Sequence, residues 1–522
     1  MFLDAAALSQ AEPPKADLCI IGAGAAGLAM AWHLRDSPLR VVLLESGGTT
    51  QNPAAPDASA SALNAGLSNH SDYPFETSRA RGFGGTTALW TGACVPLDAD
   101  DFEERDWVPY SGWPIGPKDL ARYYPLSEPI FGMVDPEPHL ASLKMSPFNG
   151  GAMAARFAQI TRQGQFAPRF MPMVAGSDRL TCILGATVTG FEVAEGGRTV
   201  IGVRIRDGAA NQHILSARAT VIATGGIEAP RLLLSEVRQI GAAMGPAANV
   251  IGRYHMEHPI RSLGVVRVPN ATECMTAFTN LKETGHAALQ GIFGLNRETR
   301  QRERLLNTHF RVYRFHALEN DPAIVRLKNL ARREEPIVGA IARASILSDF
   351  AKCATYGAWH IWNKSSRNAW FDHVRLQGFV EQEPDPNNRI TLSDQTDRYG
   401  QPLPQLALNE SALMKDSLSR TLDIVASSLA ERGLTDVQLG EDQVRHLEHY
   451  GGYGLHHMGG TRMSAEPSNG VVDADCRIHG MANLFVASSS VFPTGGAANP
   501  TLTICALALR LADHLANMLK PR

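Results

Sequence analysis

A short apolar strand, a glycine-rich turn and an Ala/Leu-rich helix form the first clear pattern in the chain. Leu18–Ile21 and Val41–Leu44 are apolar without interruption, and Ala25–Arg35 carries small and apolar residues at helical spacing. Continuous apolar runs of this length are typical of parallel strands buried on both faces. The order strand, turn, helix, strand therefore predicts a parallel α/β unit over residues 16–48.

The rest of the chain alternates between strand-rich and helical patterns. Residues 183–224 predict a meander of strands, and ATVIATGGIEAPRLLL at its end repeats the strand–turn–helix order. Residues 410–433 predict a helix, and residues 473–519 predict a loop, a strand, a turn and a final helix. Residues 49–80 are rich in Ala, Ser, Asn and Pro and predict an extended surface loop. Residues 260–400 lose this rhythm, which favours a second domain.

Charge and composition exclude several classes of protein. The chain has 522 residues and a formal net charge of −3, so no positive excess favours nucleic acid or an anionic membrane. Its seven cysteines are scattered without a CxxC pair, which argues against a disulfide framework, structural zinc or an iron–sulfur cluster. The first residues lack the pattern of a signal peptide, and Arg510 and Asp513 interrupt the longest apolar stretch. We therefore expect a cytoplasmic protein with no metal, no nucleic acid and no membrane span, with export beside a partner subunit left open.

The first glycine-rich turn fits a dinucleotide. Gly22, Gly24 and Gly27 form GxGxxG between a strand and a helix, and Glu45 ends the next strand. Such glycines allow a tight turn, the approach of a pyrophosphate to the backbone, and close packing of helix on strand. The helix dipole favours the phosphates, and a carboxylate at the position of Glu45 accepts hydrogen bonds from ribose hydroxyls. The unit predicts dinucleotide binding but does not separate NAD from FAD, and its place early in the chain favours FAD.

A second glycine-rich turn lies in RGFGGTTALWTGACVP, residues 81–96. Gly84 and Gly85 can bring backbone N–H groups against a phosphate or a ring edge, and Thr86 and Thr87 can add hydroxyl hydrogen bonds. An ordinary loop is the alternative interpretation of this stretch alone.

Six segments, in order along the chain, resemble the glucose–methanol–choline (GMC) oxidoreductases, a family of FAD-dependent alcohol oxidases and dehydrogenases. They are CIIGAGAAGL…LLESGG, GFGGTTALWTG, VIATGGIEAPRLLL, IGRYHMEHP, HHMGGTRM and GVVDADCRIHGMANLFVASSSVFPTGGAANPTLTICALAL. The last segment looks most like the sugar-oxidising branch, which contains pyranose oxidases, glycoside oxidases and bacterial sugar dehydrogenases.

The resemblance implies a fold of class α/β with two parts. One is a Rossmann-like FAD-binding domain assembled from discontinuous segments, and the other is an α+β substrate domain with an antiparallel sheet. We expect residues 1–259 to form the FAD domain, with substrate-domain insertions around 100–180, and residues 260–440 to form the substrate domain. Residues 441–522 would return to the FAD domain and carry the catalytic pair.

The resemblance also implies how FAD is held. Some members attach FAD covalently through a histidine just before a tryptophan, but here Leu89 precedes Trp90, so we expect non-covalent FAD. The candidate cofactor-binding residues are Gly22, Ala23, Gly24, Ala25, Ala26, Gly27, Glu45, Ser46, Arg81, Gly84, Gly85, Thr86, Thr87, Gly92, Ala93, Val188, Ala223, Gly225, Ser488, Asn499, Pro500 and Thr501.

Two segments near the C-terminus, GLHHMGGTRM and FPTGGAANPTLT, carry the candidate chemistry. Oxidation of an alcohol needs a base that takes the hydroxyl proton as hydride leaves the carbon, and the pKa of histidine lies near neutrality. The family places its base three residues before the glycine of an HxxG turn, which is His456 here. It places a His or Asn partner in the last turn before the final helix, which is Asn499. His457 is the alternative base, and without the resemblance both histidines would be interpreted as packing residues.

The expected function is oxidation of a secondary hydroxyl of a sugar or glycoside to a ketone. The alternatives are oxidation of a non-sugar primary or aromatic alcohol, a non-catalytic flavin-binding subunit, and an NAD-only dehydrogenase. The electron acceptor is oxygen, a quinone or a redox protein, and the sequence leaves the choice and the oligomeric state open. Two other stretches are ambiguous: the aromatic run 355–370 suggests core packing or a substrate cap, and RETRQRERLL suggests a solvated helix face.

Overall fold

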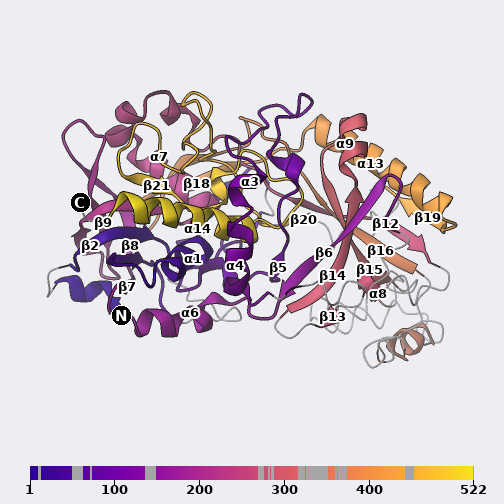
Figure 1. Cartoon of the computed structure of the whole chain (residues 1–522), viewed down its shortest axis with the longest axis horizontal. Coiled ribbons are helices and arrows are strands. Elements are labelled where there is room, and N and C mark those ends of the chain that lie inside the picture. Colours follow the sequence, from indigo (N-terminus) through magenta and orange to yellow (C-terminus); the bar gives the residue numbers. More distant parts are fainter. Residues whose placement is uncertain are drawn as a thin grey trace, which may run out of the picture.

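Two large sheets, one parallel and one antiparallel, organise the molecule and lie at opposite ends of it in Figure 1. Both chain termini lie at the end that holds the parallel sheet. The computed structural model describes residues 1–9, 13–49, 63–70, 73–133, 135, 148–268, 276–279, 282–283, 287–315, 324, 351–358, 361, 373–440 and 452–520.

The parallel sheet has six strands in the order β1-β7-β3-β2-β11-β21. Their bounds are β1 (Phe2–Asp4), β2 (Ala16–Ile21), β3 (Val41–Leu44), β7 (Leu180–Leu184), β11 (Ala217–Ile222) and β21 (Leu484–Val486). Every residue of β3 is buried, as expected for an apolar strand covered on both faces. In register, Ile21 at the end of β2 lies beside Leu44 and Ile222, so three strand ends meet at one edge of the sheet.

Helices pack against this sheet, and three of them begin at the same edge. The helices of this part are α1 (Ala25–His33), α3 (Pro117–Leu120), α4 (Tyr123–Phe131), α6 (Phe166–Ala175), α7 (Gly225–Met244) and α14 (Thr501–Met518). Helix α1 has the sequence AAGLAMAWH, whose small residues let it pack closely on β2 and against α14. Two three-stranded sheets flank this part: β8 (Thr187–Val193), β9 (Val200–Arg206) and β10 (Gln212–Leu215), and β17 (Arg389–Thr396), β18 (Pro402–Ala407) and β4 (Leu67–Ser68).

The large antiparallel sheet follows the order β19-β12-β16-β15-β14-β6-β5, with β13 beside β14 and β20 beside β12. One of its faces packs against helix α13 (Ala412–Glu431) and the other is turned away from that helix. The strands are β5 (Ala93–Cys94), β6 (Met153–Thr161), β12 (Pro259–Arg267), β13 (Lys282–Glu283), β14 (Ala287–Leu295), β15 (Thr308–Phe315), β16 (His373–Val380), β19 (Thr435–Leu439) and β20 (Gly452–Tyr453). The short helices α8 (Thr276–Thr279) and α9 (Arg297–Glu303) precede β13 and β15.

Alternation along β15 and β16 separates the two faces of this sheet. Phe310 and Val312 of β15, with Leu376 of β16, share a hydrophobic core with Leu418 and Leu422 of α13. Because successive side chains of a strand point to opposite faces, the residues between them point away from α13. The register places two of these, Arg311 and Gln377, directly opposite each other.

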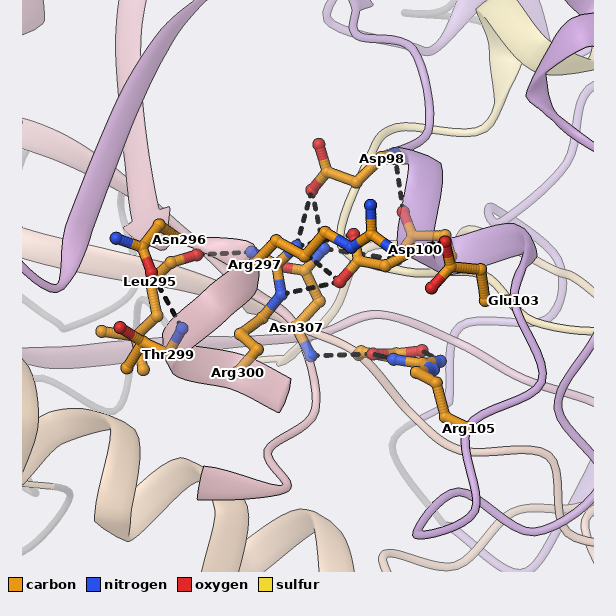
Figure 2. A network of polar contacts seen from close by, with 12 residues as sticks. Asp98, Asp100, Glu103, Arg105, Leu295, Asn296, Arg297, Thr299, Arg300 and Asn307 are labelled. Carbon is orange, nitrogen blue, oxygen red and sulfur yellow. Dashed lines mark hydrogen bonds and ion pairs between the residues drawn. The ribbon is translucent and has the colours of Figure 1, made fainter. Parts of the chain in front are cut away.

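Buried charged groups tie the segment after β5 to the large antiparallel sheet, in a set we call the junction network (Figure 2). Arg105 pairs with Glu381 at 2.5 Å, and Arg300 of α9 pairs with Asp100 at 2.8 Å. All four side chains are at most 7% exposed. The amide nitrogen of Asn307 donates to Asp98 at 2.9 Å, and Asp98 also pairs with Arg156 and contacts His309. Each charge of the network therefore has a partner of opposite sign.

The structure confirms the predicted fold class and corrects three details. The first helix ends at His33 rather than Arg35. The described part of residues 49–80 is not an extended surface loop, because Asn64, Tyr73 and Phe75 are buried. RETRQRERLL forms helix α9, but its face is not wholly solvated because Arg300 is buried against Asp100.

Two further predictions concern the aromatic run 355–370 and a membrane-spanning helix. Most of the aromatic run 355–370 lies outside the described residues, so the choice between a core and a cap stays open. Among the described residues, none of the helices is both long enough and apolar enough to cross a membrane.

Candidate active site

A cavity of about 730 Å³ lies at the edge of the parallel sheet where its strands end. One wall comes from the glycine turns after β2 and β11, and the opposite wall comes from β12, β15 and β16 of the antiparallel sheet. The segment after β20, with His456, and the turn before the last helix, with Asn499, also line the cavity. In parallel α/β sheets, ligands bind beyond the carboxyl ends of the strands, as this cavity does.

Three helix N-termini open onto the cavity without a side-chain cap. Helices α1, α7 and α14 begin there, and their N-cap residues Gly24, Thr224 and Pro500 form no side-chain cap hydrogen bond. Free N–H groups at the positive end of a helix attract anions, phosphates above all. The buried hydroxyls of Thr187 and Thr224 on the same wall also lack a hydrogen-bond partner within the described chain. This wall therefore offers unused donors to a phosphate-bearing ligand.

The two predicted glycine turns pack directly on each other. A Cβ added at Gly85, whose φ is +56°, would lie 2.7 Å from the Cα of Gly24, so only glycine fits there. The carboxylate of Glu45 accepts from the backbone N–H groups of Ala23 at 3.0 Å and of Gly82 at 2.9 Å. Glu45 thus joins the first turn to the second. Its expected contact with ribose stays a prediction.

Most predicted cofactor-binding residues line this cavity. These are Gly22, Gly24, Ala25, Ala26, Glu45, Ser46, Arg81, Gly85, Thr86, Thr87, Val188, Ala223, Gly225, Ser488, Asn499, Pro500 and Thr501. The structure does not place the other predicted residues, Ala23, Gly27, Gly84, Gly92 and Ala93, on its wall. Ala23 and Gly84 are buried behind the wall and joined by a backbone hydrogen bond of 2.8 Å. Gly92 lies on a separate surface hollow beside Trp90.

The wall from the antiparallel sheet carries polar and aromatic side chains that the sequence analysis did not select. Arg311 and Tyr313 of β15, with Gln377 and Phe379 of β16, line the cavity. All four alternate with the residues that pack on α13. The strand THFRVYRF carries this alternation in its sequence, but the pattern does not say which face meets a cavity.

A chain of hydrogen bonds fixes the protonation pattern of His456. The carbonyl of Gly496 can only accept, so Nε2 of His258, 2.8 Å away, carries a hydrogen. Nδ1 of neutral His258 is then an acceptor, and Nδ1 of His456 donates to it at 2.8 Å. Nε2 of His456 therefore carries a lone pair. The amide nitrogen of Asn499 donates to it at 3.2 Å, while the amide oxygen accepts from Arg311 at 3.0 Å.

The surroundings keep His258 and His456, the two histidines of this hydrogen-bond chain, uncharged. Burial lowers the pKa of His258 to about 4. Burial holds the pKa of His456 well below its usual range, and His258 and the positive charge of Arg311 lower it further. A neutral imidazole whose Nε2 carries a lone pair can accept a proton from a group in the cavity.

Glu257 lies behind His456 and was also missed from the sequence, although IGRYHMEHP contains it. Its side chain is fully buried, and Oε2 accepts from the backbone N–H of His456 at 2.7 Å. Oε1 accepts from the hydroxyl of Tyr73 at 2.8 Å and lies 3.4 Å from Nε2 of His457. Burial raises the pKa of Glu257 to about 8. The ring of His457 lies near Tyr73 and His255, so its described neighbours differ from those of His456.

Two family models match the chain. Residues 17–251 match the model described as FAD dependent oxidoreductase, and residues 384–508 match the model described as GMC oxidoreductase. Together these ranges include both glycine turns, the three uncapped helix N-termini, His456 and Asn499.

Several known enzymes are similar to this chain at low identity. Paromamine 6′-oxidase of Streptomyces fradiae is 25% identical over 530 residues, which cover 97% of this chain and 92% of that protein. The fructose dehydrogenase large subunit of Gluconobacter japonicus is 25% identical over 319 residues, 59% of this chain and 49% of the relative, so the match spans about half of that subunit. C-glycoside 3-oxidase of Microbacterium trichothecenolyticum is 33% identical over 148 residues, 28% of this chain and 27% of the relative.

A solved structure shares the fold. Formate oxidase of Aspergillus oryzae RIB40 superposes with a TM-score of 0.53 at 16% identity, over 97% of this chain and 99% of that one. At this identity the likeness concerns the fold alone.

Proposed function

Because the chain belongs to the FAD-dependent GMC oxidoreductases, which act on alcohols, we propose that it oxidises a secondary hydroxyl of a sugar or glycoside to a ketone. The names of two relatives support a sugar, since one is a fructose dehydrogenase and another is a C-glycoside 3-oxidase. We propose that the part built on the parallel sheet, residues 1–259 and 441–522 with insertions, holds FAD. The part built on the antiparallel sheet would hold the substrate.

The cavity suits FAD in size and chemistry. The turns at Gly22–Gly27 and Gly84–Thr87 and the N-termini of α1, α7 and α14 would hold the cofactor, with its phosphates at the uncapped N–H groups. When bound, FAD supplies the acceptor for the hydride that leaves the substrate carbon. Leu89 borders the cavity where some relatives have a linking histidine, so we propose that FAD is held without a covalent bond.

The hydrogen-bond chain through His258, His456 and Asn499 is the observation that carries the proposed mechanism. A hydroxyl that enters between His456 and Asn499 would replace the hydrogen bond between them and donate its proton to the Nε2 lone pair of His456. The same oxygen would accept a hydrogen bond from the Asn499 amide, which stabilises the negative charge that develops on it. The carbon would then release hydride and become a carbonyl.

His258 would stabilise the protonated base. Once Nε2 of His456 holds the substrate proton, the ring carries a positive charge, and its Nδ1–H still donates to Nδ1 of His258. A hydrogen bond from a charged donor is stronger than one between neutral groups. The carbonyl of Gly496 holds His258 in the tautomer that accepts this bond.

Anaerobic reduction of the bound flavin by a panel of alcohols tests the proposed function. The panel contains free sugars, methyl glycosides, simple primary alcohols and aromatic alcohols, and the flavin absorbance is followed after mixing. We expect sugars or glycosides to bleach the flavin fastest and NMR of the product to show a new ketone. Faster bleaching by a non-sugar primary or aromatic alcohol would favour the alternative substrate, and no bleaching by any alcohol would contradict the proposal.

Acid precipitation tests how the cofactor is held. Yellow colour should leave with the supernatant when the protein is denatured. Colour that stays with the pellet would contradict non-covalent binding. The same preparation can distinguish oxygen from another electron acceptor. Reduced enzyme mixed with air-saturated buffer should reoxidise slowly if a partner other than oxygen is the main acceptor.

A further inference from the structure

Arg311 is a buried cation on the substrate wall of the cavity. It is 9% exposed, and one guanidinium nitrogen donates to Oδ1 of Asn499 at 3.0 Å. The guanidinium carbon lies 4.4 Å from the ring centroid of Phe379, so the group is stacked on that ring. Among the residues that the structure describes, no carboxylate forms an ion pair with Arg311. By contrast, Arg105 and Arg300 of the junction network each pair with a carboxylate.

Among the described residues, no titratable group near Arg311 supplies a compensating negative charge. Burial keeps the rings of His456 and His258 neutral by lowering the pKa of each. Glu257 has a raised pKa of about 8, so it is mostly protonated at neutral pH, and Glu381 is already paired with Arg105. A buried charge without a partner is strongly unfavourable. In the described part of the chain, the charge of Arg311 next to the proposed base is therefore not balanced by a carboxylate.

A compensating negative charge would lie close to the reacting carbon. Asn499 contacts both Arg311 and His456, so the guanidinium is one side chain away from the atom that would take the hydroxyl proton. Arginine has five N–H donors and this contact uses one nitrogen, which leaves a fork suited to a carboxylate. Gln377 lies opposite Arg311 in the sheet, and both it and Tyr313 line the cavity, where they can meet further hydroxyls.

We propose that the substrate is a sugar acid, with a carboxylate that binds Arg311 within a few bonds of the hydroxyl that is oxidised. This inference rests on the proposed function and narrows its substrate class. The carboxylate balances the positive charge of Arg311 and orients the carbinol between His456 and Asn499.

Equilibrium binding tests the proposal without any turnover. FAD-loaded enzyme is titrated with tetrahydropyran-2-carboxylate, a ring acid with no hydroxyl to oxidise, and with the neutral tetrahydropyran-2-carboxamide, and the change in flavin absorbance gives each Kd. The wild type should bind the acid at least about 10-fold more tightly than the amide, because the acid alone forms a charged hydrogen bond with Arg311. Arg311→Gln should reduce this ratio to about one, and Arg311→Lys should keep part of it. Arg267→Gln is the matched control, since Arg267 is an exposed arginine on β12 of the same sheet and its variant should behave as the wild type.

Kinetics with paired substrates complete the test. The rate of anaerobic flavin reduction is compared for glucuronate with glucose and for methyl glucuronide with methyl glucoside. We expect Arg311→Gln to lower kcat/KM for the acids by about 10²-fold and for the neutral partners by less than about 10-fold. An equal loss for acids and neutral sugars would overturn the proposal, because Arg311 would then act only by holding Asn499. A wild type that binds acid and amide equally would also overturn it. Tight acid binding without reduction by any alcohol would instead contradict the proposed function and leave the anion site intact.

Discussion

The junction network and the cavity wall at His456 are both made of buried polar groups, but they treat those groups in opposite ways. In the network, Arg105 meets Glu381 and Arg300 meets Asp100, so every charge is neutralised by the protein itself (Figure 2). At the cavity, Nε2 of His456 accepts only from the neutral amide of Asn499, and Arg311 has no carboxylate partner among the described residues. In the junction network, paired charges stabilise the contact between two parts of the fold. At the cavity, His456 can still accept a proton and Arg311 can still bind an anionic ligand.

The two regions touch at Gly496. Its carbonyl fixes the tautomer of His258, and a Cβ added to it would clash with the carboxylate of Asp101, a neighbour of Asp100 in the network. The hydroxyl of Thr494, two residues earlier, donates to the backbone carbonyl of Asp101 at 2.6 Å. The junction network therefore supports the turn that holds His258.

Removal of the proposed base, His456, should give the largest effect on the rate of flavin reduction. We expect His456→Gln to slow flavin reduction by about 10²–10⁴-fold, the usual contribution of a positioned base. FAD content should be unchanged, because the phosphates would be held by distant turns. His457→Gln is the control and should have a mild effect on the rate. The rate of flavin reduction in both variants is measured by stopped flow. A severe loss in the His457 variant with a mild loss in the His456 variant would show that His457, not His456, is the base.

Breaking one pair of the network should mainly affect stability. Glu381→Ala leaves Arg105 buried without a partner and should lower the free energy of unfolding by about 3–5 kcal/mol. Asn499→Ala at the cavity should lower it far less while slowing flavin reduction. Urea denaturation followed by circular dichroism measures the first effect. The double variant Arg105→Met/Glu381→Leu should recover much of the stability, and no recovery would mean that packing rather than charge explains the loss.

Loss of the hydrogen bond from His456 to His258 should have an intermediate effect on the rate. We expect His258→Leu to reduce kcat for flavin reduction by about 10–100-fold with little change in KM, because His456 loses the acceptor that orients it. His258→Gln offers both an acceptor and a donor and should retain most of the activity. If the leucine and glutamine variants had identical rates and pH profiles, His258 would be a packing residue only.

The smallest expected effect concerns pH and Glu257. The folded protein keeps the proton of Glu257 up to about pH 8, whereas the unfolded chain releases it near 4.5. The folded state binds more protons in this window, so this group makes stability fall as pH rises. Between pH 6.5 and 8 the loss should be about 1–2 kcal/mol. Urea denaturation across this range should show the loss in the wild type and not in Glu257→Gln, and an equal slope in both would assign the effect to another group.

The sequence predicted the parts of the fold that depend on local pattern. The strand, turn, helix and strand of residues 16–48 were found within two residues of their observed ends, because buried parallel strands and glycine turns have local signatures. His456 and Asn499 were selected through family resemblance, and the structure places them 3.2 Å apart. Their catalytic roles stay predictions.

The rest of the site depends on contacts between distant segments. His258 and Glu257 lie about 200 positions before the histidines that they contact, so their roles follow from tertiary packing rather than from spacing. The alternation around Arg311 was visible, but the choice of the cavity face over the α13 face depends on the whole sheet. The same reason explains the error at Arg300, whose charged run suggested solvent because its partner Asp100 is remote in sequence.

The two faces of β15 and β16 also have a consequence for how this enzyme can diversify. Phe310, Val312 and Leu376 pack in the core with α13, whereas Tyr313 and Gln377 of the same strands line the cavity. Mutations on the cavity side can therefore accumulate without loss of the hydrophobic core. A library restricted to the cavity-facing positions should yield mostly folded variants with altered substrate range, so selectivity in this fold can evolve almost independently of stability.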